Sequence, residues 1–166
     1  MLIVRGALPQ DDARVGELLV EAFVETYARK MPEVVVDENR KRDLRDVATK
    51  RGEAAVLVAE LDGAVVGPVA VFKLGSPQSQ AWLPNAVDLR HLAVDPRCHG
   101  RGISKALLDR AEALAREEWK VSAICLHVRR GAVGVARLYL SRGYQRDPAG
   151  DLAKPTVFLE GYALRF

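Results

Sequence analysis

The sequence contains little cysteine and no long hydrophobic run. Only 2 of its 166 residues are cysteine, too few for a disulfide framework or a cysteine-rich zinc cluster. No apolar run reaches the roughly 18–20 residues that a membrane-spanning helix needs. The first residues, MLIVRG, are too short for a secretory signal and carry their charge on the wrong side. These absences exclude a membrane protein, a secreted disulfide scaffold and a zinc-finger module, and they favour a cytoplasmic location.

A strong excess of one charge sign is also missing. Lysine and arginine total 25 against 22 aspartate and glutamate residues, which gives a net charge of +3. Basic and acidic residues are interleaved along the chain, so this excess does not indicate a nucleic-acid partner by itself. Apolar residues make up 49% of the chain, and no linker or repeat interrupts it. We therefore expect one globular domain over residues 1–166.

The spacing of apolar residues predicts alternating strands and helices. From Asp11 onward an apolar helical face forms, and Met31–Pro32 ends this helix. Further helices are expected at residues 37–50, 103–118 and 132–142, the last stopped by Gly143. Strands are expected at residues 2–4, 54–61, 64–74, 87–94, 121–128 and 156–165. This order predicts a mixed α/β sheet with an antiparallel hairpin, one parallel strand pair and helices on its faces.

Three local features carry specific expectations. Asp62–Gly63 favours a tight hairpin turn, because both turn positions need a positive φ. Pro68 has no N–H donor, so it is expected at a bulge or a sheet edge. The helix at residues 37–50 has few apolar residues (Leu44, Val47 and Ala48), and we expect it to lie on the surface.

The most informative segment is the loop between the strand at residues 87–94 and the next helix. Its sequence is Arg97-Cys98-His99-Gly100-Arg101-Gly102, followed by the helix that begins at Ile103. Glycines let the backbone curl, and the first amides of a helix lack acceptors within that helix. Such a turn is suited to a phosphate or diphosphate. The common dinucleotide fingerprint fails, because position 105 is lysine instead of glycine, and no Walker loop is present.

This loop and a later segment resemble the GNAT superfamily of acyl-CoA-dependent N-acyltransferases. The family signature is Arg or Gln, two residues, Gly, one residue, then Gly or Ala, which Arg97 to Gly102 match. The segment ARLYLSRGY at residues 136–144 is similar to a later family helix, in which a Leu-Tyr pair precedes a Gly-aromatic end. The element order agrees from residue 2 to residue 166. The resemblance implies an α/β fold with a mixed, mostly antiparallel central sheet, one parallel pair and helices on both faces.

The resemblance also implies a binding site for acetyl-CoA as co-substrate, with no metal. Loop amides would hold the diphosphate, and the pantetheine arm would lie between the two parallel strands. Main-chain groups of Leu92 and Val94 would pair with this arm, and the Val94 N–H would face the thioester oxygen. The implied cofactor-binding residues are Leu92, Ala93, Val94, Arg97, Cys98, His99, Gly100, Arg101, Gly102, Ile103 and Ser104.

The family pattern places two residues in the chemistry. Tyr139 matches the tyrosine that protonates the leaving thiolate. A protonated amine cannot attack a thioester, so a base must first remove a proton, and Asp88 or a water chain would do so. Purely structural roles remain open for both residues: Tyr139 as a core aromatic residue and Asp88 as a solvated carboxylate at a strand edge. Trp82 and Tyr27 either line the acceptor pocket or pack as ordinary aromatic residues.

The expected reaction is direct transfer of an acetyl group to a primary amine of a small molecule or peptide. The sequence departs from the family at Ala132, where an asparagine usually begins the later helix. One alternative is therefore an acyl-CoA-binding module of the same fold with weak or absent turnover. A nucleic-acid-associated basic protein is supported only by the charge excess. No membrane partner and no specific nucleic acid are expected, and the fold is compatible with a homodimer.

Overall fold

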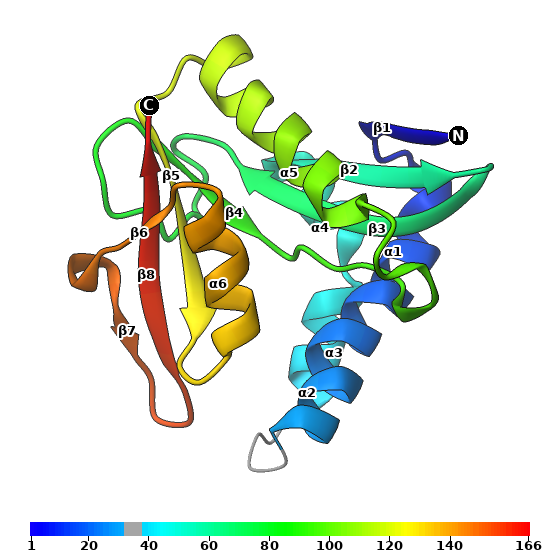
Figure 1. The fold of residues 1–166 in the computed structure, drawn as a ribbon, viewed down its shortest axis with the longest axis horizontal. Coiled ribbons are helices and arrows are strands. Elements are labelled where there is room, and N and C mark those ends of the chain that lie inside the picture. The colour runs from blue at the N-terminus through cyan, green and yellow to red at the C-terminus, as the bar shows by residue number, and fades with distance from the viewer. Residues whose placement is uncertain (32–37) are drawn as a thin grey trace. The chain divides into compact units, whose positions relative to one another are not determined.

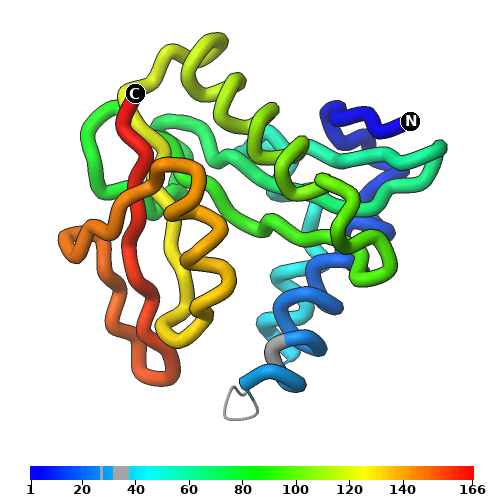
Figure 2. The backbone as a smooth tube through the Cα atoms, viewed as in Figure 1, coloured from blue at the N-terminus to red at the C-terminus, as the bar shows by residue number. Residues whose placement is uncertain are grey.

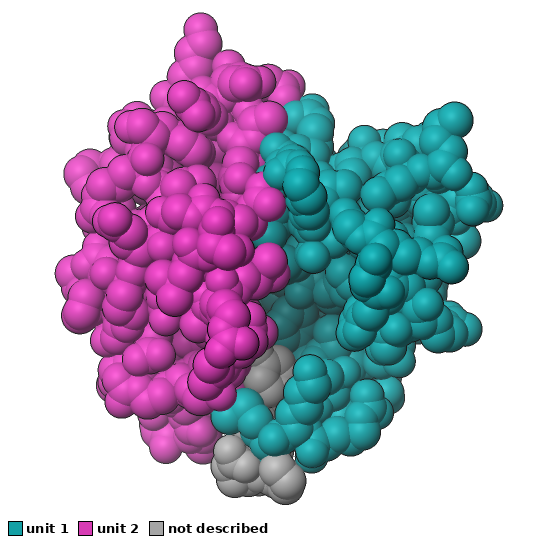
Figure 3. All heavy atoms as spheres, in the orientation of Figure 1, with its two compact units in different colours: residues 1–70, 91–111 teal, residues 71–90, 112–166 magenta. Residues whose placement is uncertain are grey.

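The computed structural model describes residues 1–31 and 38–166, except for the side chain of Tyr27. These residues form two compact units, coloured separately in Figure 3. Unit 1 contains residues 1–70 and 91–111, and unit 2 contains residues 71–90 and 112–166. Each unit is built from two separate stretches of the chain. The single domain over residues 1–166 stays a prediction.

Unit 1 contains the first strands of the chain. Strand β1 (Leu2–Gly6) pairs antiparallel with β2 (Ala54–Leu61), in a register that joins Leu2 to Leu61. Strand β3 (Ala64–Phe72) follows β2 after the predicted turn. Asp62 and Gly63 have φ values of 50° and 86°, so both turn residues adopt the positive φ that the Asp-Gly pair favours.

The helices of unit 1 come from two regions of the chain. Helix α1 (Asp12–Val20) continues through a π-helical turn (Glu21–Glu25) into α2 (Thr26–Lys30). Helices α3 (Glu38–Arg45) and α4 (Val47–Glu53) replace the single helix expected at residues 37–50, of which residue 37 lies outside the described residues. The interruption falls at Asp46, whose carboxylate caps α4 by accepting from the Thr49 N–H at 3.3 Å.

The segment expected on the surface at residues 37–50 is mostly exposed over its described residues 38–50, but two of its apolar residues reach the core. Leu44 and Val47 are 0% and 1% exposed, and they join the core formed by α1 and β2. The charged residues of α3 face solvent, while its single buried residue, Leu44, points into that core. A helix can therefore be strongly polar in composition and still anchor the core through one or two positions.

Helix α5 (Ile103–Ala113) starts in unit 1 and covers one face of the strands of that unit (Figures 1 and 2). Its first turns pack on β3 at Gly67, where a Cβ would lie 3.2 Å from Leu107 and 3.4 Å from Ile103. The same Cβ would meet the carbonyl oxygen of Ala93 at 2.6 Å, closer than real contacts allow. Glycine at position 67 thus lets the chain on both sides of the two-glycine loop approach β3.

Unit 2 contains the parallel strand pair. Strand β4 (Ala86–Arg90) runs parallel to β5 (Ala123–Arg129), and β5 pairs antiparallel with β8 (Phe158–Arg165). The short strands β6 (Gln145–Arg146) and β7 (Leu152–Ala153) also pair antiparallel with β8. Helix α6 (Val133–Ser141) ends before Gly143, whose φ of 96° fulfils the predicted helix stop.

The fold class expected from the sequence is confirmed. The sheet is mixed and mostly antiparallel, β4 and β5 are its parallel pair, and helices pack against it. Within the described residues, no helix combines the length and apolar character that a membrane crossing requires.

Replacement of Leu44 by alanine tests the buried position of this side chain. The change removes buried methyl groups and leaves a cavity, so we expect the free energy of unfolding to fall by about 2–5 kcal/mol. The matched control is Leu140→Ala on α6, where the leucine is 51% exposed and the expected change is within about 0.5 kcal/mol. Urea unfolding measures both, and equal losses in the two variants would place Leu44 outside the core.

Candidate active site

The two-glycine loop of unit 1 has a backbone suited to an anion. Gly100 and Gly102 have φ values of 79° and 74°, a conformation that other residues rarely adopt. The first bond of α5 runs from the Ala106 N–H to the Gly102 carbonyl, at 3.0 Å. The amides of Ile103, Ser104 and Lys105 therefore precede the first acceptor within the helix, and the positive end of the helix dipole lies behind them.

The amides at the start of the loop are already used by the protein. The N–H groups of Arg97, Cys98 and His99 donate within the 3-10 turn Pro96–Cys98, to the Asp95 carboxylate, the Asp95 carbonyl and the Pro96 carbonyl. The sequence predicts that amides across residues 97–103 hold a diphosphate. In this structure, the donors suited to that role begin only after this turn, at the glycines and the first turn of α5.

The chain leading into the loop differs from the predicted strand. Regular β4 ends at Arg90, not at Val94, because His91 has a φ of 61° and breaks the extended conformation. After this break, the N–H groups of Ala93 and Asp95 donate to the carbonyls of Pro68 (3.1 Å) and Val66 (2.7 Å) on β3.

This pairing with β3 sets the direction of the peptide groups after β4. The peptide groups of Leu92 and Val94 alternate with those of Ala93 and Asp95, so they face away from β3. Pro68 lies inside β3, where its carbonyl accepts from Ala93 and it has no N–H to donate in return. Its expected place at a bulge or a sheet edge stays a prediction.

Asp95 is the centre of a charge cluster that sequence reasoning missed. Its carboxylate is buried, and it accepts from the guanidinium of Arg97 at 2.8 Å and that of Arg14 at 2.7 Å. Arg14 belongs to α1 and also donates to the carbonyl of Val65 on β3, at 3.1 Å. Hydrogen bonds from Arg97, ahead of those from Arg14, hold the pKa of Asp95 far below its usual value despite burial.

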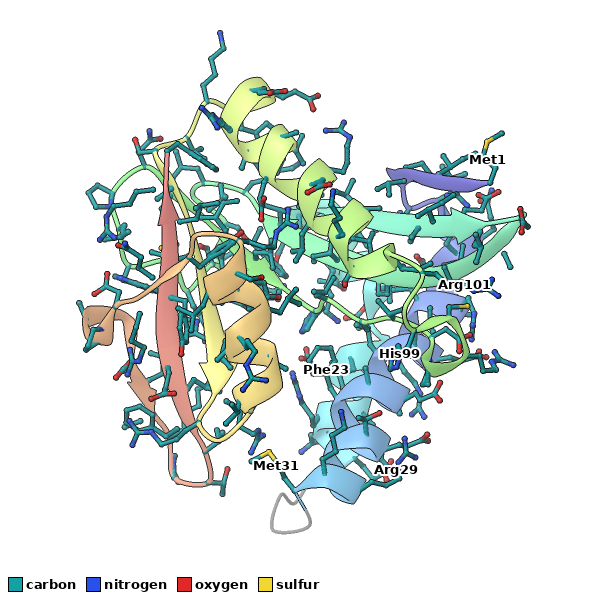
Figure 4. The ribbon with its side chains drawn as sticks, in the orientation of Figure 1. Met1, Phe23, Arg29, Met31, His99 and Arg101 are labelled. Carbon is teal, nitrogen blue, oxygen red and sulfur yellow. The ribbon has the colours of Figure 1, made fainter. Side chains whose placement is uncertain are left out.

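The side chains of the loop are exposed to different degrees. His99 and Arg101 are exposed (Figure 4), Cys98 is half-buried, and the side chain of Arg97 remains 81% exposed although it pairs with Asp95. Arg97, Cys98 and Arg101 also line a pocket of about 570 Å³ together with Arg14 and the turn between β2 and β3.

In unit 2, Asp88 lies on β4 with its side chain 0% exposed. One carboxylate oxygen, Oδ2, accepts from Arg90 Nε at 2.7 Å and from the Gln80 N–H at 2.8 Å. Among the residues that the structure describes, no hydrogen-bond partner lies against the other oxygen, Oδ1, although it is buried. The alternative of a solvated carboxylate is therefore wrong: Asp88 is an enclosed carboxylate, held on one side by Arg90.

Strand pairing in unit 2 becomes looser beside Asp88. Parallel pairing joins Ala86 to Ala123, Val87 to Ile124 and Asp88 to Cys125. Both strands continue beyond this point, to Arg90 and Arg129, without further pairs between β4 and β5 in the described part of the chain.

Tyr139 lies on α6 in unit 2 and is 5% exposed. Its ring packs edge-to-face against Tyr144, with centroids 5.3 Å apart at an angle of 68°. The Tyr144 hydroxyl donates to Glu112 at 3.1 Å, and Arg142 pairs with the same carboxylate at 2.7 Å. Burial, followed by the charge of Glu112, raises the pKa of Tyr144 well above its usual value. Tyr139 therefore combines a core position with a ring held by a rigid neighbour.

Trp82 and Cys125 both lie in surroundings typical of residues that stabilise the fold. The Trp82 indole donates to Asp147 at 2.9 Å and packs against His127 and Gly150. Cys125 is fully buried, and burial raises the pKa of its thiol, as expected of an unreactive core cysteine. The side chain of Tyr27, the other candidate for the acceptor pocket, lies outside the described part of the structure.

Of the two missed residues, Asp95 and Arg14, only Asp95 carries a signal in the sequence. The pair Asp95–Pro96 is typical of a residue that caps a short turn, because proline is favoured at the first position after the cap. Arg14 carried no local signal, since its partner Asp95 lies 81 positions further along the chain.

Comparison with known proteins agrees with the resemblance to the GNAT family that the sequence carries. A model described as the acetyltransferase (GNAT) family matches residues 13–144. The chain belongs to the GNAT acetyltransferase family. A search among curated proteins finds no match.

Solved structures of GNAT proteins share the fold at low sequence identity. A GNAT acetyltransferase from Staphylococcus aureus Mu50 is 16% identical, with a TM-score of 0.75 and 99% of both chains covered. The PaiA N-acetyltransferase from Thermoplasma acidophilum, in complex with coenzyme A, is also 16% identical, with a TM-score of 0.73 over 100% of this chain and 99% of that one. A ribosomal-protein-alanine N-acetyltransferase from Brucella melitensis is 20% identical, with a TM-score of 0.67 and 99% of both chains covered.

Acid titration tests the charge cluster of Asp95, Arg97 and Arg14 at the start of the two-glycine loop. Because the pKa of Asp95 is lowered in the folded state, its charge stabilises the fold above the unfolded pKa of about 3.9. This stabilisation is lost as the pH falls towards the folded pKa. We expect Asp95→Asn to unfold more easily than the wild type at pH 7, with a difference that shrinks below about pH 4. A constant difference from pH 7 to pH 2.5, measured by urea unfolding, would contradict this cause.

Proposed function

We propose that this protein is an acetyl-CoA-dependent N-acetyltransferase that acts in the cytoplasm on a primary amine of a small molecule or peptide. The observation that carries the proposal is the pair of left-handed glycines before α5, which leaves helical amides without acceptors inside the helix. Membership of the GNAT acetyltransferase family gives this anion site its ligand class. The coenzyme A complex of the Thermoplasma relative supports the same ligand.

The loop residues fit the diphosphate of coenzyme A. A Cβ at Gly100 or Gly102 would meet nothing within 4 Å among the described residues, so space for a ligand remains against the loop backbone. In the proposed complex, amides from Gly100 to Ser104 bind the diphosphate, and the exposed guanidiniums of Arg97 and Arg101 add positive charge. Leu92, Ala93 and Val94 form the edge along which the pantetheine arm lies, and the Val94 N–H binds the carbonyl oxygen of the acetyl group.

Acetyl-CoA supplies the activated acetyl group, and the reaction then requires two proton transfers. The acceptor amine has to lose a proton before it can attack, and Asp88 is the proposed base. Its Oδ1 is the atom suited to accept a proton, because Oδ2 is held by Arg90 and Gln80. Since the side chain is fully buried, the proton would reach Oδ1 through a bridging water.

Tyr139 is the proposed acid that returns a proton to the leaving thiolate. The edge-to-face packing on Tyr144 fixes the direction of its ring, and burial keeps bulk water away from it. A thiolate is a good leaving group, so this proton speeds the release of coenzyme A and is not indispensable.

The second candidate function is an acyl-CoA-binding module without turnover. Two observations favour it: Asp88 is engaged by Arg90, and Ala132 at the start of α6 cannot make the contact to the cofactor arm that the usual asparagine of the family would make. The Brucella relative is named for acetylating an alanine of ribosomal protein, so protein amines belong among the acceptors tested. A homodimer is also proposed.

An acceptor screen separates the two candidates. Calorimetry with acetyl-CoA tests binding, and a free-thiol assay with polyamines, amino acids, aminoglycosides and peptide N-termini tests transfer. Binding with amine-dependent thiol release supports the enzyme. Binding without release from any amine supports the module, and absence of binding contradicts both.

Tyr139→Phe tests the proposed acid. The ring and its packing on Tyr144 are kept, so we expect turnover to fall by about 10-fold or more with little change in acetyl-CoA affinity. The matched control is Tyr144→Phe, which removes a hydroxyl from the neighbouring ring and should lower stability by about 0.5–1.5 kcal/mol without a comparable loss of turnover. Unchanged turnover in Tyr139→Phe would remove this residue from the chemistry.

A further inference from the structure

Arg14 connects helix α1 to the start of the two-glycine loop. Its Nη2 lies 2.7 Å from Oδ2 of Asp95, and its Nε donates to the Val65 carbonyl at 3.1 Å. The Asp95 N–H in turn donates to Val66, the next residue of β3. These two bonds fix the guanidinium of Arg14 in place beside Asp95. Among the described residues, the Asp95 carboxylate is the one that accepts from the loop backbone between residues 96 and 102.

That carboxylate is poorly placed for a protein that binds a diphosphate. Asp95 has to be there, because its Oδ1 accepts the Arg97 N–H at 3.0 Å and shapes the turn. Its negative charge, however, repels an anion at the loop and competes with that anion for the Arg97 guanidinium. With Arg97 as sole partner, the pair would carry no net charge towards the ligand.

Arg14 changes this balance. Two guanidiniums surround the one buried carboxylate, which leaves a surplus charge of about +1 beside Asp95. Arg14 Nη1 also lies 3.5 Å from Glu17, but the Glu17 side chain is 70% exposed, so water screens this second pair. The side chain of Arg14 is 33% exposed and that of Arg97 is 81% exposed, so Arg14 lies on the inner side of the carboxylate and Arg97 on the solvent side. The surplus charge is therefore available where a ligand in solution would meet the loop.

We propose that Arg14 is a positioning residue for the binding loop: it neutralises Asp95, so that Arg97 stays available to the diphosphate of the ligand. This role rests on the proposed binding of acetyl-CoA. It is distinct from holding α1 in place, because a second ion pair already does that. Arg51 on α4 binds Asp12 of α1 through two hydrogen bonds of 2.8 Å.

Calorimetry with coenzyme A on the full chain tests the proposal. We expect Arg14→Gln to raise the dissociation constant by about 10-fold or more, the lower end of the scale for one charge-assisted hydrogen bond. Arg14→Lys keeps the charge and should stay within about 3-fold of the wild type. Arg51→Gln breaks the matched ion pair to α1 and should leave the dissociation constant unchanged, even if it lowers the unfolding temperature.

The decisive variant is the double change Arg14→Gln with Asp95→Asn. Asparagine keeps an oxygen that can accept the Arg97 N–H, but it removes the charge that Arg14 offsets. We expect the double variant to bind coenzyme A more tightly than Arg14→Gln alone, by about 3-fold or more. A merely structural role predicts the opposite, because a second lost contact would weaken the loop further.

The outcomes separate this inference from the proposed function. If the wild-type protein binds no coenzyme A, the proposed function fails and this inference fails with it. If the wild type binds and folded Arg14→Gln binds equally well, only the role of Arg14 is overturned. An equal loss in Arg14→Lys and Arg14→Gln, or a double variant weaker than Arg14→Gln, also overturns it.

Discussion

The hydrogen bonds that helix α5 cannot make within itself set the requirements for the rest of the site. Its first amides follow two glycines in the left-handed conformation and need an acceptor from outside the helix. A free backbone donor costs little in water, but it contributes strongly when it meets an anion in a fixed position. The protein supplies this fixed position by tying the preceding chain to β3 through Ala93 and Asp95.

The neighbouring features of unit 1 serve the same constraint. Gly67 allows α5 and the carbonyl of Ala93 to approach β3. Pro68 accepts from the Ala93 N–H and has no N–H of its own that would need an acceptor in the irregular chain after β4. Asp95 shapes the turn at the cost of a buried negative charge, and two arginines offset that charge. In unit 2, Asp88 and Tyr139 are both buried and held by neighbours, so the groups proposed for proton transfer are pre-oriented.

The sequence predicts those parts of the structure that local physics determines. The bounds of β2, the Asp62–Gly63 turn, the left-handed Gly143 and the two-glycine loop follow from residues close to one another in the chain. It fails where distant residues decide. Leu44 is buried because α1 and β2 enclose it, the chain after β4 bonds to β3 through Ala93 and Asp95, and the Arg14–Asp95 pair spans 81 positions. The identity of the acceptor amine has no comparable local signature.

The most direct test of the account compares acetyl-CoA with acetyl-pantetheine, which has the same thioester and arm but no diphosphate. If backbone amides at the start of α5 hold the diphosphate, calorimetry should give a dissociation constant at least about 100-fold weaker for acetyl-pantetheine, the scale of two charge-assisted hydrogen bonds. Similar dissociation constants for the two ligands would contradict the account, because the loop around Gly100 and Gly102 would then contribute nothing to binding.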